Sequence, residues 1–128
     1  MSDLVALTVF AGIPVRSLSS AAEWYGTLFG RQPDARPAPA IAEYYLGEGR
    51  VPERGTLQLR EDSARAGGGL VTINVGDIQE VARRLGALDV TLETQTFPIE
   101  AETVSAVTVG AFEDPDGNAV TVVQPHAR

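Results

Sequence analysis

Ile13-Pro14-Val15-Arg16-Ser17-Leu18 and Ile73-Asn74-Val75-Gly76-Asp77-Ile78 are two copies of one short pattern, sixty residues apart. In each copy an apolar, strand-like run leads to a Ser or Asp that can cap a helix. Apolar residues then recur at helical spacing. They are Ala22, Tyr25 and Leu28 after the first copy, and Ala82, Leu85 and Leu88 after the second. An internal repeat of this kind predicts a fold built from two copies of one supersecondary unit.

Turn residues and apolar periodicity divide each copy further. The first helix is expected to be capped by Ser17 or Ser20 and to end at Gly30, and the second to begin at Asp77. Three prolines predict an irregular connection over residues 33–39, and 96–102 reads as an acidic loop. The expected strands are residues 4–15, 41–46, 55–60, 70–75, 90–95, 103–113 and 119–124.

The order of these elements is close to βαβββ, twice over. It predicts an α+β fold in which two tandem modules form a curled mixed or antiparallel sheet with the helices outside. We expect a single domain over residues 1–128, with modules at about 4–62 and 70–125. Gly67-Gly68-Gly69 is the expected linker between them.

Composition excludes several kinds of chemistry. The 128 residues include no Cys and no Lys, which removes disulfides, thiolate nucleophiles and Schiff-base lysines. A net charge of −7 with ten scattered arginines argues against a nucleic-acid partner. No apolar run is long enough to span a bilayer and no signal peptide is visible, so we expect no membrane partner and a cytoplasmic location.

Strand alternation identifies the sheet face that points away from the helices. Because Val9, Ala11 and Ile13 have the parity of a helix-packed face, their neighbours in sequence face the other way. This concave face is expected to be apolar with neutral hydrogen-bonding groups and one cation, and to orient a small ligand. The candidate ligand-binding residues are Thr8, Phe10, Gln58, Arg60, Leu70, Thr72, Asn74 and Thr121.

Each of these residues also has a purely structural interpretation. The Thr, Gln and Asn side chains can simply satisfy a buried sheet face. Arg60 can bind a ligand carboxylate or phosphate with its planar guanidinium, or it can be a solvated charge near Glu61 and Asp62. Trp24 is expected at a rim or a subunit contact, or buried against a loop, because Tyr25 fits the apolar helix face.

Four segments together resemble the vicinal-oxygen-chelate superfamily, which includes glyoxalase I, extradiol dioxygenases and bleomycin-resistance proteins. The segments are Pro14–Leu18, Trp24–Gly30, Val75–Ile78 and Phe112–Asn118, whose spacing covers nearly the whole chain. The resemblance implies the paired-module fold predicted above. It also implies a homodimer, with modules that pair within or between chains.

The resemblance further implies metal ligands, commonly His or Glu, on the first and last strand of each module. At those positions this chain has Phe10, Gln58, Leu70 and Thr121. None of these side chains is a strong ligand for a divalent metal. The only histidine, His126, lies beyond Pro125 in the expected tail. We therefore expect no metal, no cofactor and no catalytic residue.

The sequence thus favours a metal-independent protein that binds, and so sequesters, an unidentified small molecule. One alternative is a metal-dependent lyase, isomerase or oxygenase with displaced ligands such as Glu43, Glu102 or Glu113. The other is a structural or regulatory protein whose concave face is filled by its own side chains. The residues leave the choice between enzyme and non-enzyme open, with the balance toward a non-enzyme.

Overall fold

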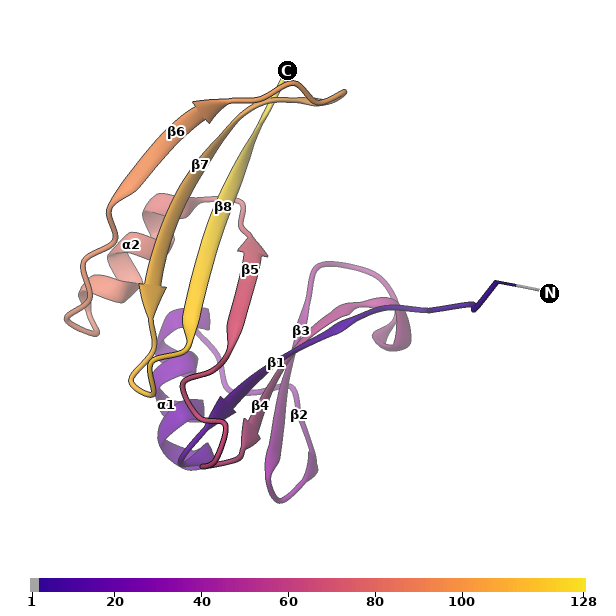
Figure 1. The fold of residues 1–128 in the computed structure, drawn as a ribbon, viewed down its shortest axis with the longest axis vertical. Coiled ribbons are helices and arrows are strands. Elements are labelled where there is room, and N and C mark those ends of the chain that lie inside the picture. The colour runs from indigo at the N-terminus through magenta and orange to yellow at the C-terminus, as the bar shows by residue number, and fades with distance from the viewer. Residues whose placement is uncertain (1–2) are drawn as a thin grey trace.

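The chain folds as two similar modules in the computed structural model, which describes residues 3–128 (Figure 1). The first module contains β1 (Phe10–Val15), α1 (Leu18–Phe29), β2 (Ala35–Ala38), β3 (Ile41–Leu46), the short 3₁₀ helix η1 (Val51–Glu53) and β4 (Gly55–Glu61). The second contains β5 (Leu70–Asn74), α2 (Ile78–Gly86), β6 (Thr94–Pro98), β7 (Val104–Glu113) and β8 (Ala119–Ala127).

Each module is one four-stranded mixed sheet with its helix on one face. The strand orders are β1-β4-β3-β2 and β5-β8-β7-β6, so corresponding strands occupy corresponding places. The first and last strands of each module are parallel, and the remaining pairs are antiparallel. The predicted α+β fold with a repeated βαβββ unit is confirmed. Among residues 3–128, neither helix is long and apolar enough to cross a membrane.

Both helices begin at the predicted repeat. The Ser17 hydroxyl accepts a hydrogen bond from the Ser20 amide, so Ser17 and not Ser20 caps α1. Gly30 ends this helix with φ of 73°, a left-handed conformation that glycine adopts without strain. Asp77 caps α2 by accepting from two backbone amides. Local capping chemistry therefore sets three of the four helix ends near their predicted positions.

The first strand is shorter than predicted, and one predicted loop is a strand. Residues 4–9 were expected in the first strand, but pairing with β4 starts only at Phe10, opposite Thr56. The preceding residues run past the end of β4 and project from the body of the molecule (Figure 1). Within 33–39, Ala35–Ala38 forms β2 in spite of its proline. Proline is tolerated there because β2 is an edge strand and need not donate on both sides.

One strand of the second module is displaced from its predicted position, and the last strand begins where predicted and is longer. The strand expected at 90–95 lies instead at Thr94–Pro98, again at a sheet edge. Val90 and Leu92 gave a strand-like pattern because they pack from a loop against the core. The last strand continues to Ala127, so His126 is not in a free tail. Its Nε2 atom lies 2.7 Å from the Thr108 hydroxyl.

The turn between β7 and β8 joins the two modules through a buried carboxylate. Asp114 accepts a hydrogen bond of 2.7 Å from the hydroxyl of Tyr25 in α1. The same carboxylate accepts from the amides of Asp116 and Asn118 and from the Asn118 side chain. Since Tyr25 and Asp114 are both buried, this contact fixes α1 against the second sheet. Trp24, predicted at a rim or against a loop, packs partly buried on the core beside Phe112.

Asn118 extends the same junction to the first strand and the linker. Its amide nitrogen donates 2.8 Å to the Pro14 carbonyl, and its oxygen accepts 2.7 Å from the Gly69 amide. A side chain at Gly69 would place its Cβ 2.8 Å from that oxygen and 3.2 Å from Pro14. The chain therefore needs glycine where the linker passes the turn.

Replacing Tyr25 by Phe is expected to lower the free energy of unfolding by about 1.5–3 kcal/mol, because it removes a buried hydrogen bond to a charged group. Burial and the neighbouring Asp114 carboxylate raise the pKa of Tyr25 above its usual range. The unfolded chain therefore loses this proton first, and the wild-type protein should lose stability as the pH rises above about 10. Tyr25→Phe should lose less, keeping only the part due to Tyr44, whose pKa burial also raises. Urea unfolding at several pH values measures both effects. Tyr45→Phe is the control, since the Tyr45 hydroxyl has no hydrogen-bond partner within residues 3–128. Equal losses of unfolding free energy in the two variants would contradict a stabilising role for the hydrogen bond between Tyr25 and Asp114.

Gly69→Ala should destabilise the fold by about 1–3 kcal/mol, because the added methyl group collides with Asn118 and Pro14 at the junction. Gly76→Ala is the matched control, since a Cβ at Gly76 meets nothing within 4 Å. Thermal unfolding of both variants compares them directly. Similar melting temperatures would show that the linker can move away from the turn.

Candidate functional site

The sheet of the first module has one face packed on α1 and one face open. Ile13 and Val15 of β1 and Leu57 and Leu59 of β4 are buried on the helix side. The alternate residues face the other way, and register aligns them in three rows across β1, β4 and β3. The rows are Phe10, Thr56 and Tyr45; Gly12, Gln58 and Glu43; and Pro14, Arg60 and Ile41.

The second module repeats this arrangement with different side chains. Val71, Val120 and Phe112 are buried on the side of α2 and Trp24. The rows of the opposite face run across β5, β8 and β7 and are largely apolar. They are Leu70, Ala119 and Glu113; Thr72, Thr121 and Ala111; and Asn74, Val123 and Val109. We call these rows and those of the first module the concave face.

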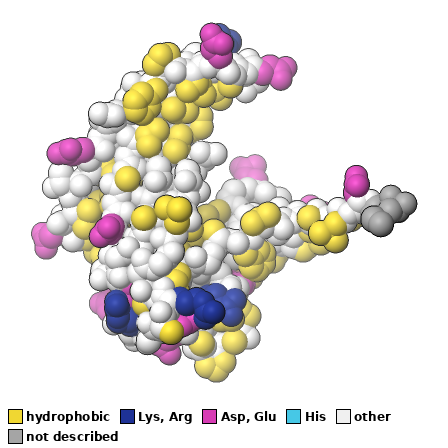
Figure 2. All heavy atoms as spheres, in the orientation of Figure 1, with side chains coloured by type: hydrophobic (Ala, Val, Ile, Leu, Met, Phe, Trp, Pro, Cys, Tyr) yellow, Lys and Arg dark blue, Asp and Glu magenta, His cyan; other side chains and the backbone are white. Residues whose placement is uncertain are grey.

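The two parts of the concave face border a hollow between the modules. Figure 2 shows this hollow, with hydrophobic side chains of the second module along one side of it. A cavity of about 450 Å³ lies where β1 and β4 approach β5. Thr56, Thr72 and Asn74 line it from the concave face. Its apolar lining includes Val9, Ala11, Leu57 and Ile73, which have the opposite parity, so the cavity lies at the edge where the two sheets meet. The place where the modules meet is therefore open enough to admit a small molecule.

The predicted ligand-binding residues fall into two groups that no one cavity unites. Gln58 and Arg60 neighbour each other on β4, and Thr72 lies opposite Thr121 in the second sheet. Phe10 is 49% exposed and Leu70 is 81% exposed. Asn74 is also exposed and lines the cavity near β5. Thr8, outside β1, donates from its hydroxyl to the Arg54 carbonyl at 3.3 Å.

One residue of the concave face was not among the predicted ligand-binding residues. Glu43 was considered only as a displaced metal ligand, yet it is 7% exposed and lies in the central row beside Gln58. Its carboxylate accepts 2.7 Å from the Gln58 amide, whose oxygen accepts 3.1 Å from Arg60. Alternation within the predicted strand 41–46 could have revealed it, because Glu43 has the opposite parity to the buried Ala42 and Tyr44.

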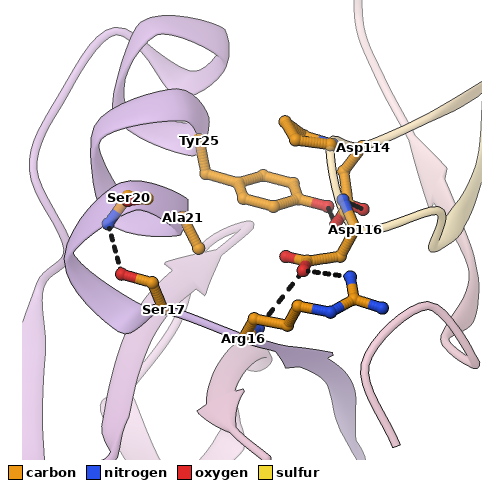
Figure 3. Close-up of a pocket in the computed structure, with 8 residues that line it drawn as sticks. Arg16, Ser17, Ser20, Ala21, Tyr25, Asp114 and Asp116 are labelled. Atoms are coloured by element: carbon orange, nitrogen blue, oxygen red, sulfur yellow. Dashed lines mark hydrogen bonds and ion pairs between the residues drawn. The ribbon is translucent and has the colours of Figure 1, made fainter. Parts of the chain in front are cut away.

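A second cavity, of about 220 Å³, lies on the helix side between α1 and the β7–β8 turn (Figure 3). Tyr25 and Asp114 point toward each other there, and Arg16 donates 2.9 Å to Asp116. The Ser17 oxygen is engaged in capping α1. Because its polar groups are paired with one another, this cavity belongs to the junction between the modules, and it offers a ligand little beyond a small apolar surface.

The donor chemistry of the concave face does not fit a divalent metal. The four positions implied by the resemblance hold two hydrocarbon side chains, an amide and a hydroxyl. Within residues 3–128 no three His, Asp or Glu side chains lie close enough together to hold a metal ion. Glu43, the one carboxylate buried on this face, is instead hydrogen-bonded to Gln58. The residues present therefore do not support the metal chemistry of the superfamily.

Solved structures of other proteins resemble this chain over nearly its whole length. A glyoxalase/bleomycin-resistance protein from Catenulispora acidiphila aligns with a TM-score of 0.73 and 26% identity, over 93% of this chain and 98% of its own. The chain has the glyoxalase/bleomycin-resistance fold. Its structural neighbours are consistent with the vicinal-oxygen-chelate superfamily named by resemblance. No protein-family model and no curated protein matches the sequence.

Other proteins of this glyoxalase/bleomycin-resistance fold include an antibiotic-binding protein and a lyase. TnmS3, an antibiotic-binding protein from Streptomyces sp. CB03234, aligns with a TM-score of 0.59 and 18% identity, over 98% of this chain and 99% of its own. Lactoylglutathione lyase from Agrobacterium tumefaciens aligns with a TM-score of 0.61 and 18% identity, over 97% and 95%. At these identities the likeness extends to the fold, which hosts both a binding protein and an enzyme.

Proposed function

We propose that this protein binds a small, partly apolar molecule on its concave face without using a metal. The observation that carries the proposal is an open face whose superfamily metal positions hold Phe10, Gln58, Leu70 and Thr121. An antibiotic-binding protein of the same fold supports sequestration as the biological outcome. No catalytic residue and no cofactor are part of the proposal.

The observations favour binding over both alternatives. A metal-dependent lyase, isomerase or oxygenase would need Glu43, Glu102 or Glu113 to converge. No metal-holding group of His, Asp or Glu is formed within the described residues, and Glu43 is occupied by Gln58. A face filled by its own side chains would bury Phe10 and Leu70, which are exposed instead. Open apolar surface beside a cavity is what a ligand pocket requires.

Ligand binding is tested with a panel of metabolites and antibiotics, measured by calorimetry together with elemental analysis of the purified protein. We expect stoichiometric binding of at least one compound, unchanged by a strong chelator, and less than a tenth of an equivalent of transition metal. Gly12→Val should weaken that binding without loss of stability, because a Cβ at Gly12 meets nothing within 4 Å and would occupy the open face. A tightly bound, stoichiometric metal would overturn the proposal.

We further propose that the protein is a homodimer in which a second copy covers the projecting segment before β1. This segment, residues 3–9, is strongly apolar, with Leu4 92% and Val9 80% exposed. The segment continues the direction of β1 past the point where pairing with β4 begins (Figure 1). Its apolar side chains and its unpaired backbone groups therefore lie outside its own sheet. Free strand backbone next to exposed apolar residues favours pairing with another chain.

Light scattering after gel filtration should give twice the 13.5 kDa chain mass. The double substitution Leu7→Asp and Val9→Asp should convert the protein to monomers, since it places charges on the projecting segment. Phe97→Asp, at an exposed apolar residue of β6 in the other module, serves as the control and should remain dimeric. A monomeric wild-type protein at micromolar concentration would contradict the dimer.

A further inference from the structure

Arg60 is one of the five arginines that form no ion pair within residues 3–128. Five others form ion pairs with Asp or Glu; they are Arg16, Arg31, Arg65, Arg83 and Arg84. Arg60 lies on the concave face of β4 and has no carboxylate within 4.0 Å among residues 3–128. Its Nη1 atom donates 3.1 Å to a neutral group, the oxygen of Gln58. Its positive charge is thus free to pair with a ligand.

The buried Glu43 sets the direction in which Gln58 points. The amide nitrogen of Gln58 donates 2.7 Å to the side-chain oxygen of Glu43. The amide oxygen then faces the opposite way, toward Arg60. Glu43 therefore acts through Gln58 to hold the guanidinium in place, and part of the entropy cost of ordering Arg60 is met before a ligand arrives.

Space for an anion lies directly beside Arg60. A cavity of about 330 Å³ is lined by Gly12, Pro14, Arg60, Asp62 and Arg65. Gly12 leaves the strand surface open, because a Cβ there would meet nothing within 4 Å. Asp62 and Arg65 form an ion pair of 2.9 Å with each other, so Arg60 is the lining cation that has no carboxylate within 4.0 Å among the described residues. Figure 2 shows basic side chains at the lower end of the molecule, with acidic side chains among them.

We propose that the ligand of the concave face carries a carboxylate or an equivalent anionic group, which Arg60 binds. A guanidinium offers a planar pair of donors that matches a carboxylate. The row next to Arg60 holds Gly12, Gln58 and Glu43, so the apolar body of the ligand would cross this row over Gly12 and reach toward Phe10 in the row beyond. This inference rests on the proposed binding function and specifies its ligand class: small organic acids with an apolar body.

Three probes with the same apolar body and different head groups test the inference: 3-phenylpropionate, 3-phenylpropanol and 3-phenylpropylamine. Titrations followed by ¹⁵N–¹H correlation spectra give the affinity of each probe and the amides that it perturbs. We expect the carboxylate to bind about tenfold more tightly than the alcohol, as a charge-assisted hydrogen bond implies, and the amine to bind least. The amides of Gly12 and Arg60 should shift most with the carboxylate.

Two variants separate binding from positioning. Arg60→Gln should abolish the carboxylate preference while leaving alcohol binding unchanged, and Arg36→Gln, at an exposed arginine of β2, is the matched control. Glu43→Ala should reduce the ratio of carboxylate to alcohol affinity, because the Gln58 amide is then free to turn; a merely structural role would weaken both probes equally. For both variants the measured quantity is the ratio of carboxylate affinity to alcohol affinity. Partial unfolding would weaken both probes equally and leave this ratio unchanged, so it can be told apart from loss of the carboxylate contact.

Each remaining outcome counts against the inference. Equal affinities for the carboxylate and the alcohol at the hollow would overturn it and leave the proposed binding function standing. Preference for the amine would overturn it in favour of recognition by the Glu43 carboxylate. No perturbation by any of the three probes would contradict the anionic ligand and the open apolar face together.

Discussion

The Asp114 carboxylate is the constraint on which the rest of the structure depends. It accepts hydrogen bonds from Tyr25 of one module and from three groups of its own turn. A buried carboxylate is costly unless its oxygens are satisfied, so the turn and the helix must meet in one geometry. Because α1 and the β7–β8 turn are held at this point, each sheet keeps its helix-free face toward the hollow. The site is thus positioned by a contact on the opposite side of the sheets.

The repeated βαβββ unit and the helix ends were predictable, because they rest on local chemistry. Ser17, Gly30 and Asp77 each act within a few residues of their own position. The strands at the sheet edges were less predictable. β2 and β6 are short edge strands with weak patterns, and their positions depend on neighbours far along the chain. The length of β1 likewise depends on where β4 ends, which the apolar run over residues 4–9 does not reveal.

The sequence predicted which sheet face the candidate site residues lie on. It did not predict which of their side chains are hydrogen-bonded to each other. Period-two alternation correctly separated Phe10 and Gln58 from the helix-packed residues of their strands. It could not show that Glu43 and Gln58 lie side by side, since that pairing depends on the register of β3 against β4. Hydrogen bonds between polar side chains on neighbouring strands depend on which residues the strand register places side by side. A single sequence does not specify that register directly.

The side chains at the superfamily's metal positions bear on what the proposed binding face could recognise. A bound metal would supply a concentrated positive charge near the centre of the concave face. In this chain the positive charge is displaced to Arg60, at the next row, and the centre holds Gln58 and the buried Glu43. A guanidinium fixed by an amide can orient an anion, but it cannot polarise a bond as a divalent cation does. On the function proposed above, this arrangement would select ligands by charge through Arg60 and not through a metal at the centre of the face.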